Sequence, residues 1–108
     1  MVDRPKNIGF GLRYGETQSH LAVEERCYRF FDNVDKNELL KTDIYGETPL
    51  HHAVGNEDLK MCKLLISRNK KIIHMKDMDM KTAYDWAVEY NLAYNSHIAI
   101  VKELRQYL

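Results

Sequence analysis

Residues 43–54 read Asp-Ile-Tyr-Gly-Glu-Thr-Pro-Leu-His-His-Ala-Val, and this stretch decides the fold. Gly46 supplies the positive φ angle that a tight turn needs. Thr48 is a good cap for the helix that Pro49 opens, because proline is tolerated at the first helical position, where an amide hydrogen would have no partner. The stretch therefore predicts a turn that leads directly into a helix.

The residues that follow predict a pair of helices. Leu50, Ala53 and Val54 come at helical spacing, and the small side chain of Ala53 lets neighbouring helices approach closely. Gly55 and Asn56 break this first, short helix. A second helix follows with an apolar stripe made of Leu59, Cys62, Leu65 and Ile66. The unit is therefore expected to be a helix hairpin.

The same pattern recurs on both sides of this unit. Residues 77–88, Asp-Met-Asp-Met-Lys-Thr-Ala-Tyr-Asp-Trp-Ala-Val, repeat residues 43–54, and Tyr14-Gly-Glu-Thr-Gln-Ser-His corresponds to residues 45–51. A fixed period is the signature of stacked structural units. Three units are expected after an N-terminal segment over 1–13: a degenerate first repeat over about 14–42, a second repeat over 43–76 and a last repeat over 77–108.

The pattern DxxGxTPLHxA followed by LKMCKLLI resembles the ankyrin repeat, and the middle unit matches that repeat almost residue for residue. The resemblance covers roughly residues 14–108 and implies an all-α fold, a short solenoid of stacked helix-turn-helix units with β-hairpin-like finger loops. In that family the Asp-x-x-Gly turn forms the finger, and threonine and histidine hydrogen bonds tie the helices together. Thr48 and His51 match those two positions.

The outer units depart from the family pattern. The last unit has Met80 for the glycine, Ala83 for the proline and Asp85 for the histidine. This variant resembles terminal ankyrin repeats and implies a C-terminal capping repeat. The first unit keeps the glycine, the threonine and the histidine but lacks the proline, and its shorter spacing is compatible with two helices fused into one.

An insertion near residues 89–96 lengthens the join between the two helices of the last unit. One interpretation places Tyr90, Leu92 and Tyr94 at the end of the stack opposite the fingers, where a partner reaches them. The alternative is an extended helix whose aromatic side chains cover the terminal core.

Length and composition place the chain among ordinary globular domains. The 108 residues are enough for one domain, and 44% hydrophobic with 30% charged residues excludes disorder. No apolar run reaches the roughly 20 residues that span a bilayer, and the first residues lack the apolar core of a signal peptide. The chain is therefore expected to be a soluble, cytoplasmic protein.

Cys27 and Cys62 form no CxxC and are expected to act as small hydrophobic residues without a disulfide.

No motif for catalysis, a cofactor or a metal accompanies the histidines and carboxylates. His51 and His52 are adjacent, so on a helix they point about 100° apart and share a metal poorly. The other histidines have no partner at zinc-finger spacing. Asp85 and Glu89 lie four residues apart on one helix and resemble a catalytic pair of carboxylates, but a solvated helix face explains them as well. We therefore expect no enzyme activity, no cofactor and no metal site.

The zero net charge hides an uneven distribution. Residues 14–58 sum to −6, whereas residues 59–76 sum to +6. The basic run is expected to form the outward face of the second helix and the following loop. Because no aromatic residues interleave it, the sequence argues against nucleic-acid binding and favours docking on an acidic protein.

The resemblance also implies where a partner binds, since ankyrin proteins most often use the finger tips and the exposed face of the first helices. Tyrosine and tryptophan are enriched in binding hot spots, so Tyr45 and Trp86 lead this prediction. The alternative for Trp86 is packing against His52 of the preceding unit. The complete set of predicted partner-binding residues is Ile44, Tyr45, Glu47, His52, Asn56, Met78, Asp79, Lys81, Trp86, Tyr90 and Tyr94.

The predicted function is a non-catalytic module that binds another protein, as a stand-alone binder or inhibitor that occupies its surface. The beginning at a methionine and the lack of room for a second domain favour a stand-alone protein over a multi-domain adaptor. Compact ankyrin proteins of this kind resemble viral or bacterial factors that neutralise other proteins. The alternative is a self-associating structural subunit, because the ends of a short repeat stack can pair as a homodimer.

Overall fold

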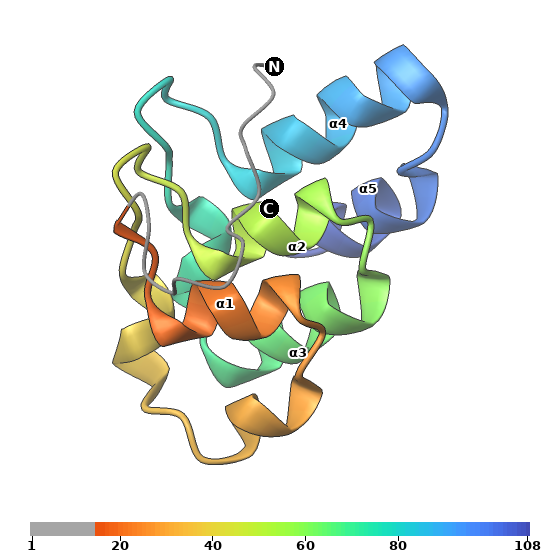
Figure 1. Ribbon diagram of the computed structural model, residues 1–108. Coiled ribbons are helices and arrows are strands. Elements are labelled where there is room, and N and C mark those ends of the chain that lie inside the picture. Colours follow the sequence, from red (N-terminus) through yellow and green to blue (C-terminus); the bar gives the residue numbers. More distant parts are fainter. Residues whose placement is uncertain (1–14) are drawn as a thin grey trace.

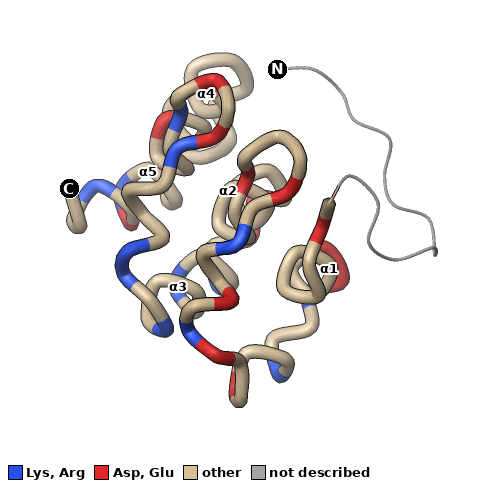
Figure 2. Tube along the Cα trace, turned by 90° about the vertical axis from the view of Figure 1, so that its left-hand side faces the viewer, with Lys and Arg blue, Asp and Glu red and all other residues tan. Residues whose placement is uncertain are grey.

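A computed structural model describes residues 15–108, so the predicted N-terminal segment over 1–13 lies outside the described residues. The helices of the described part form two layers (Figure 1). The first layer is a row of three neighbouring helices, α1 (Gln18–Glu24), α2 (Pro49–Gly55) and α4 (Ala83–Tyr94). The second layer contains α3 (Leu59–Arg68) and α5 (Ile98–Arg105). Figure 2 shows α1, α2 and α4 in this row, with α3 and α5 beside them.

Each helix of the first layer begins at a threonine. The side chains of Thr17, Thr48 and Thr82 accept the amide hydrogen of the residue three positions later. The side chain at that later position accepts the amide hydrogen of the threonine in return, which completes a capping box. Pro49 stands at the start of α2, as the sequence predicts. The cap is therefore repeated three times, and each repeat enters its first helix in the same way.

Each of these helices also ends in the same way. Arg26, Glu57 and Asn95 follow α1, α2 and α4 with left-handed φ angles of 55°, 56° and 55°. A left-handed residue turns the chain sharply after a helix, which here directs it from the first layer into the second. The end of α2 at Gly55 confirms the predicted break, and the left-handed residue is Glu57.

The first unit differs from the predicted fused helix. Its α1 stops at Glu24, and a short 3-10 helix, η2 (Tyr28–Asp32), takes the place of a second α-helix. The left-handed turn at Arg26 separates the two, so the fused helix was the wrong interpretation. Phe31 on η2 is fully buried, which shows that the short element still contributes to the core. Two further 3-10 turns precede the loops that lead to α2 and α4, namely η3 (Lys36–Leu40) and η4 (Lys70–His74).

The insertion in the last unit continues α4 as a helix. With 12 residues, α4 is longer than α2, which has seven, and its last turns extend beyond α2. Tyr90 packs against the core, but Leu92 and Tyr94 are 81% and 73% exposed. The extended helix therefore covers the core through one tyrosine and leaves the remaining apolar surface accessible.

The hydrophobic core lies between the two layers. Its largest fully buried side chains come from both layers and from the 3-10 turns, including Phe31, Leu39, Leu50, Met61, Leu65, Ile72, Ile100 and Leu104. Cys62 is buried as expected, whereas Cys27 is exposed, and both thiols are free. No helix in residues 15–108 is long and apolar enough to cross a bilayer.

Candidate functional site

Two finger loops, residues 43–47 and 77–81, project side by side at the left of Figure 1. In each finger the first aspartate holds the turn, because Oδ1 of Asp43 and of Asp77 accepts the amide hydrogens two and four residues later, all at 2.9 Å. Gly46 takes the predicted positive φ angle of 76°. Met80 replaces this glycine in the last finger and takes the same conformation, with a φ of 63°. Both fingers therefore have one backbone shape.

The fingers are linked to each other and carry apolar tips. The amide of Met78 donates to the carbonyl of Tyr45 at 3.0 Å. The side chains of Ile44, Met78 and Met80 are 58%, 65% and 67% exposed, whereas Tyr45 is half-buried. A backbone held by its own aspartates therefore presents large apolar side chains to solvent.

Two buried histidines join each repeat to the finger of the next. His20 Nε2 donates to the carbonyl of Glu47 at 2.8 Å, and His51 Nε2 donates to the carbonyl of Lys81 at 2.9 Å. Nδ1 of each ring accepts the amide hydrogen of its capping threonine, at 3.0 and 3.1 Å. This pattern requires neutral imidazoles, and burial lowers the pKa of His51 accordingly. The hydrogen-bonding role predicted for His51 is confirmed.

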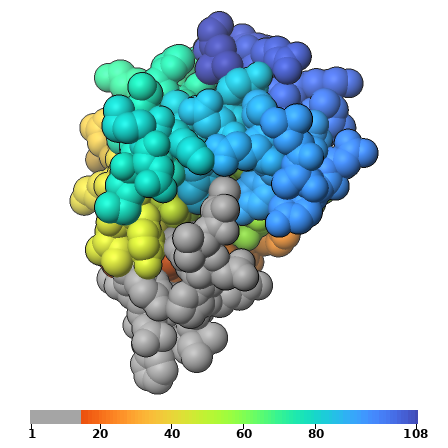
Figure 3. Space-filling model, turned by 90° about the horizontal axis from the view of Figure 1, so that it is seen from above, coloured from red at the N-terminus to blue at the C-terminus, as the bar shows by residue number. Residues whose placement is uncertain are grey.

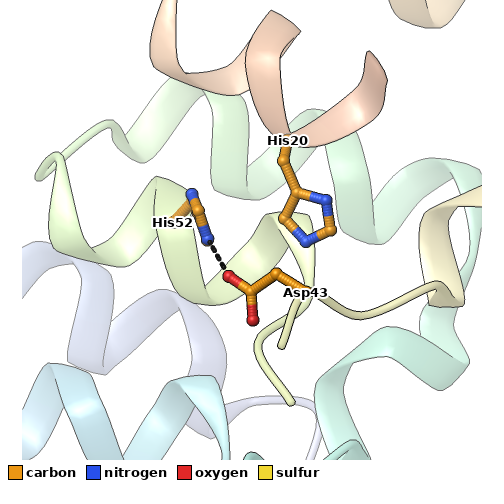
Figure 4. Close-up of side chains that lie close together, drawn as sticks. All are labelled: His20, Asp43 and His52. Atoms are coloured by element: carbon orange, nitrogen blue, oxygen red, sulfur yellow. Dashed lines mark hydrogen bonds and ion pairs between the residues drawn. The ribbon is translucent and has the colours of Figure 1, made fainter. Parts of the chain in front are cut away.

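His52 lies among three carboxylates (Figure 4 shows its bond to Asp43). Nδ1 is 2.8 Å from Oε1 of Glu24, and Nε2 is 3.0 Å from Oδ2 of Asp43 and 3.4 Å from Oε1 of Glu47. Burial favours the neutral ring, but the hydrogen bonds to the three carboxylates outweigh it and raise the pKa of His52 to about 10. Burial by itself would raise the pKa of Asp43, but the hydrogen bond and charge of His52, together with the amide hydrogens of Glu47 and Tyr45, outweigh burial and lower this pKa. A buried imidazolium therefore connects α1, α2 and the middle finger.

His20, Asp43 and His52 bring potential metal-ligand atoms within 4.8 Å of one another (Figure 4). Both nitrogens of His20 already form hydrogen bonds, and His51 forms the same pair of bonds one repeat later. His52 carries protons on both nitrogens, and a metal would have to displace one of them. The arrangement therefore fits a hydrogen-bonded network better than a metal centre.

The charged state of His52 makes stability depend on pH. Its pKa is about 6.5 in the unfolded chain and about 10 in the folded protein, so its contribution is complete below pH 6.5 and is lost as the pH rises toward 10. We expect the free energy of unfolding to fall by about 2 kcal/mol between pH 6.5 and 8.5 from this group. Urea denaturation at several pH values measures the change.

His52→Gln is the control for this pH dependence, since glutamine cannot titrate. The variant should lose the slope between pH 6.5 and 8.5. Burial raises the pKa of the Cys62 thiol, so this group also makes the free energy of unfolding fall at higher pH. That effect is the same in the wild type and in the variant. Equal slopes for the two proteins below pH 8.5 would contradict a charged His52.

Trp86 occupies the position in the last repeat that His52 occupies in the middle one. Its Nε1 donates to Oδ2 of Asp77 at 2.9 Å, as His52 donates to Asp43. The indole meets the ring of His51 edge to face, with centroids 5.2 Å apart. The alternative that Trp86 packs against the preceding repeat is therefore correct, but the neighbouring ring is His51 and not His52.

The threonine caps occur in all three repeats and the histidine bonds join successive repeats, and residues 19–107 match the family model for ankyrin repeats in three copies. The chain belongs to the ankyrin-repeat family. Ankyrin repeats are generally protein-protein interaction modules and are typically not enzymes. A comparison with curated proteins found no match.

Three residues predicted to touch a partner are buried inside this ankyrin domain. Glu47, His52 and Trp86 are only 6%, 2% and 5% exposed. The expectation that they form a binding surface is corrected, because the last two are hydrogen-bond donors to the finger aspartates and Glu47 lies beside His52. The other predicted positions reach the surface wholly or in part: Ile44, Tyr45, Asn56, Met78, Asp79, Lys81, Tyr90 and Tyr94.

The carboxylate pair considered for catalysis has structural partners in the ankyrin fold. Asp85 accepts the amide hydrogen of Thr82 at 2.9 Å and so caps α4. Glu89 forms an ion pair of 2.8 Å with Lys81. The side chains of the basic run reach the surface wholly or in part, as expected for an outward face: Lys60, Lys63, Arg68, Lys70, Lys71 and Lys76.

Sequence reasoning missed that His20, Glu24 and Asp43 all lie close to His52. One signal was available, because the spacing of nine residues from Asp43 to His52 recurs from Asp77 to Trp86. His52 and Trp86 both carry a ring N–H group, so in each pair a buried donor can satisfy the finger aspartate. The contact with Glu24 had no such signal, since it comes from another repeat.

Proposed function

We propose that this ankyrin domain is a non-catalytic binder that occupies the surface of a partner protein with its finger tips, and that it acts as an inhibitor. The observation that carries the proposal is the exposure of Ile44, Met78 and Met80 on adjacent fingers. Exposed apolar side chains that lie together mark interaction sites more often than isolated ones do. The rigid fingers add to this, because a preformed surface loses little conformational freedom on binding.

The surface next to the fingers supports the same use. Figure 3 shows the two fingers, in yellow and turquoise, and α4, in blue, on one face of the molecule. Asp79 and Lys81 are the polar residues of the last finger that reach the surface of this face. An apolar centre with charged residues around it is the usual composition of a protein-binding surface. We therefore place the partner over the fingers and the adjoining part of α4.

The double variant Ile44→Asp and Met78→Asp tests the fingers. Both side chains are exposed, so we expect the free energy of unfolding to change by less than about 1 kcal/mol. Two carboxylates at the apolar tips should weaken partner binding at least about tenfold, because they must be desolvated without a counter-charge. Quantitative affinity capture from the native lysate, with mass spectrometry, measures the loss for each captured protein.

Leu92→Ser is the matched control, since Leu92 is the most exposed large apolar side chain described and lies near the C-terminal end of α4, not on a finger. It should retain the proteins that the double variant loses. If the two variants and the wild type capture the same proteins in equal amounts, the fingers are not the binding surface.

Self-association is the second candidate function, and exposed apolar residues at the end of the stack favour it. Ile98 on α5 is 49% exposed, and Leu108 is 62% exposed. Light scattering coupled to size-exclusion chromatography distinguishes the two functions. A mass that stays that of a monomer at all concentrations counts against self-association, whereas a dimer that Ile98→Asp dissolves would favour it.

A further inference from the structure

A hollow of about 160 Å³ lies on the surface of α4, lined by Glu89, Tyr90, Ala93 and Tyr94. These residues form two rows of helical neighbours, because positions four apart lie on the same face. The rings of Tyr90 and Tyr94 are 6.3 Å apart and inclined by 35°. Ala93 has the smallest side chain of the set and leaves the space open. Two aromatic rings and one carboxylate therefore surround the same hollow.

One wall of the hollow is rigid. The ring of Tyr90 stacks on His97, with centroids 4.7 Å apart and planes inclined by 13°. His97 is itself buried and its Nε2 is 2.7 Å from the carbonyl of Val54. The hydroxyl of Tyr90 also lies close to Gly55 on α2. A ligand would therefore meet Tyr90 in a fixed position, which lowers the entropy lost on binding.

The carboxylate at the hollow already attracts a cation. Oε2 of Glu89 is 2.8 Å from Nζ of Lys81, and the two side chains are 42% and 43% exposed. An ion pair this exposed contributes little stability. Another cation can therefore replace Lys81 at Glu89 at little cost.

We propose that this hollow binds an arginine side chain of the partner protein. A planar guanidinium stacks on aromatic rings and pairs with a carboxylate through two parallel hydrogen bonds, a combination that lysine cannot match. The ring of Tyr94, which is 73% exposed, supplies the stacking surface, the ring of Tyr90 lies beside it, and Glu89 supplies the counter-charge. The proposal rests on the protein-binding function proposed above and specifies the chemistry of the partner.

A short peptide tests the hollow without knowledge of the partner. The probe is a glycine peptide with four arginines, and the matched control peptide has citrulline, which keeps the shape and lacks the charge. In NMR titrations of the ¹⁵N-labelled full chain, the arginine peptide should cause saturable shifts of the amides of residues 89–94. The citrulline peptide should cause shifts at least about tenfold smaller at the same concentration, because the charged pair is lost.

Three single variants separate this site from general charge attraction. Ala93→Leu fills the hollow from an exposed helical position, and it should abolish the saturable shifts without altering the fold. Glu89→Gln should weaken binding about fivefold, whereas Lys81→Met should tighten it about twofold to fivefold because the competing ammonium is gone. As a control, Leu92→Ala, on the same helix outside the hollow, should have no effect.

The proposal is overturned if both peptides bind equally, if the saturable shifts lie outside the hollow, or if Ala93→Leu leaves them unchanged. Its failure is distinguishable from failure of the finger surface. Peptide binding by the Ile44→Asp and Met78→Asp variant would show that the hollow acts independently of the fingers. Conversely, normal partner capture by Ala93→Leu would leave the proposal for the finger surface standing. It would also show that the arginine site takes no part in that complex.

Discussion

Replacement of His52 by leucine is expected to lower the free energy of unfolding by about 3–5 kcal/mol at pH 7. The imidazolium is 2% exposed and stands between Glu24, Asp43 and Glu47. Leucine has a similar volume, so the loss comes from the charges that remain and not from a cavity. The side chain of Asp43 is fully buried and would lose the hydrogen bond and the charge of His52. Urea denaturation at pH 7 measures the change.

A second substitution shows whether the buried carboxylate causes the loss. Asparagine in place of Asp43 would keep a side-chain oxygen for the amides of the finger, so Asp43→Asn in the His52→Leu background should recover part of the stability. The recovery should be at least about 1 kcal/mol, since a buried carboxylate that has lost the charge of His52 is neutralised. If the double variant is less stable than His52→Leu alone, the finger aspartate matters more for the turn than for the charge of His52.

The fold was predictable from local sequence because each repeat begins with short-range bonds. The Thr48 and His51 pair spans only three residues, and the positive φ angle of Gly46 follows from its residue type. Pro49 and Gly55 mark the two ends of α2. Interactions of this range depend only on residues that are close in the sequence, so a pattern of residue types is enough to predict them. The same logic failed at Arg26, where a non-glycine residue takes the left-handed conformation.

The binding surface was less predictable because burial depends on contacts between repeats. His52 and Trp86 occupy helix positions that the resemblance to ankyrin repeats predicted to be exposed, yet both are buried here with an aspartate of their own finger. The bond from His52 to Glu24 joins residues 28 positions apart. No local pattern contains such a pair, since Glu24 lies in the degenerate first repeat. The exposure of Ile44 and Met78 was predicted correctly, because their place at the tip of a projecting turn follows from the turn pattern itself.

Replacement of Gly46 by valine is expected to lower the free energy of unfolding by about 3–5 kcal/mol. The φ angle of 76° is unfavourable for a β-branched side chain. In addition, a Cβ atom at this position would lie 2.8 Å from the backbone nitrogen of Met78, closer than real contacts allow. That nitrogen donates to the carbonyl of Tyr45, so the clash also strains the link between the fingers. Thermal and urea denaturation measure the loss.

Met80→Gly is the mirror experiment, because Met80 holds the same left-handed conformation without a glycine. Its side chain is 67% exposed, so glycine removes little packing and relieves the strained φ angle. We expect this variant to gain about 0.5–1 kcal/mol, the cost of a left-handed residue less the greater freedom of glycine in the unfolded chain. A loss of stability on Met80→Gly, or none on Gly46→Val, would mean that the two fingers do not share one turn. Opposite signs at the two positions would establish that the turn itself selects glycine, and that the last repeat keeps its apolar tip at a measurable cost in stability.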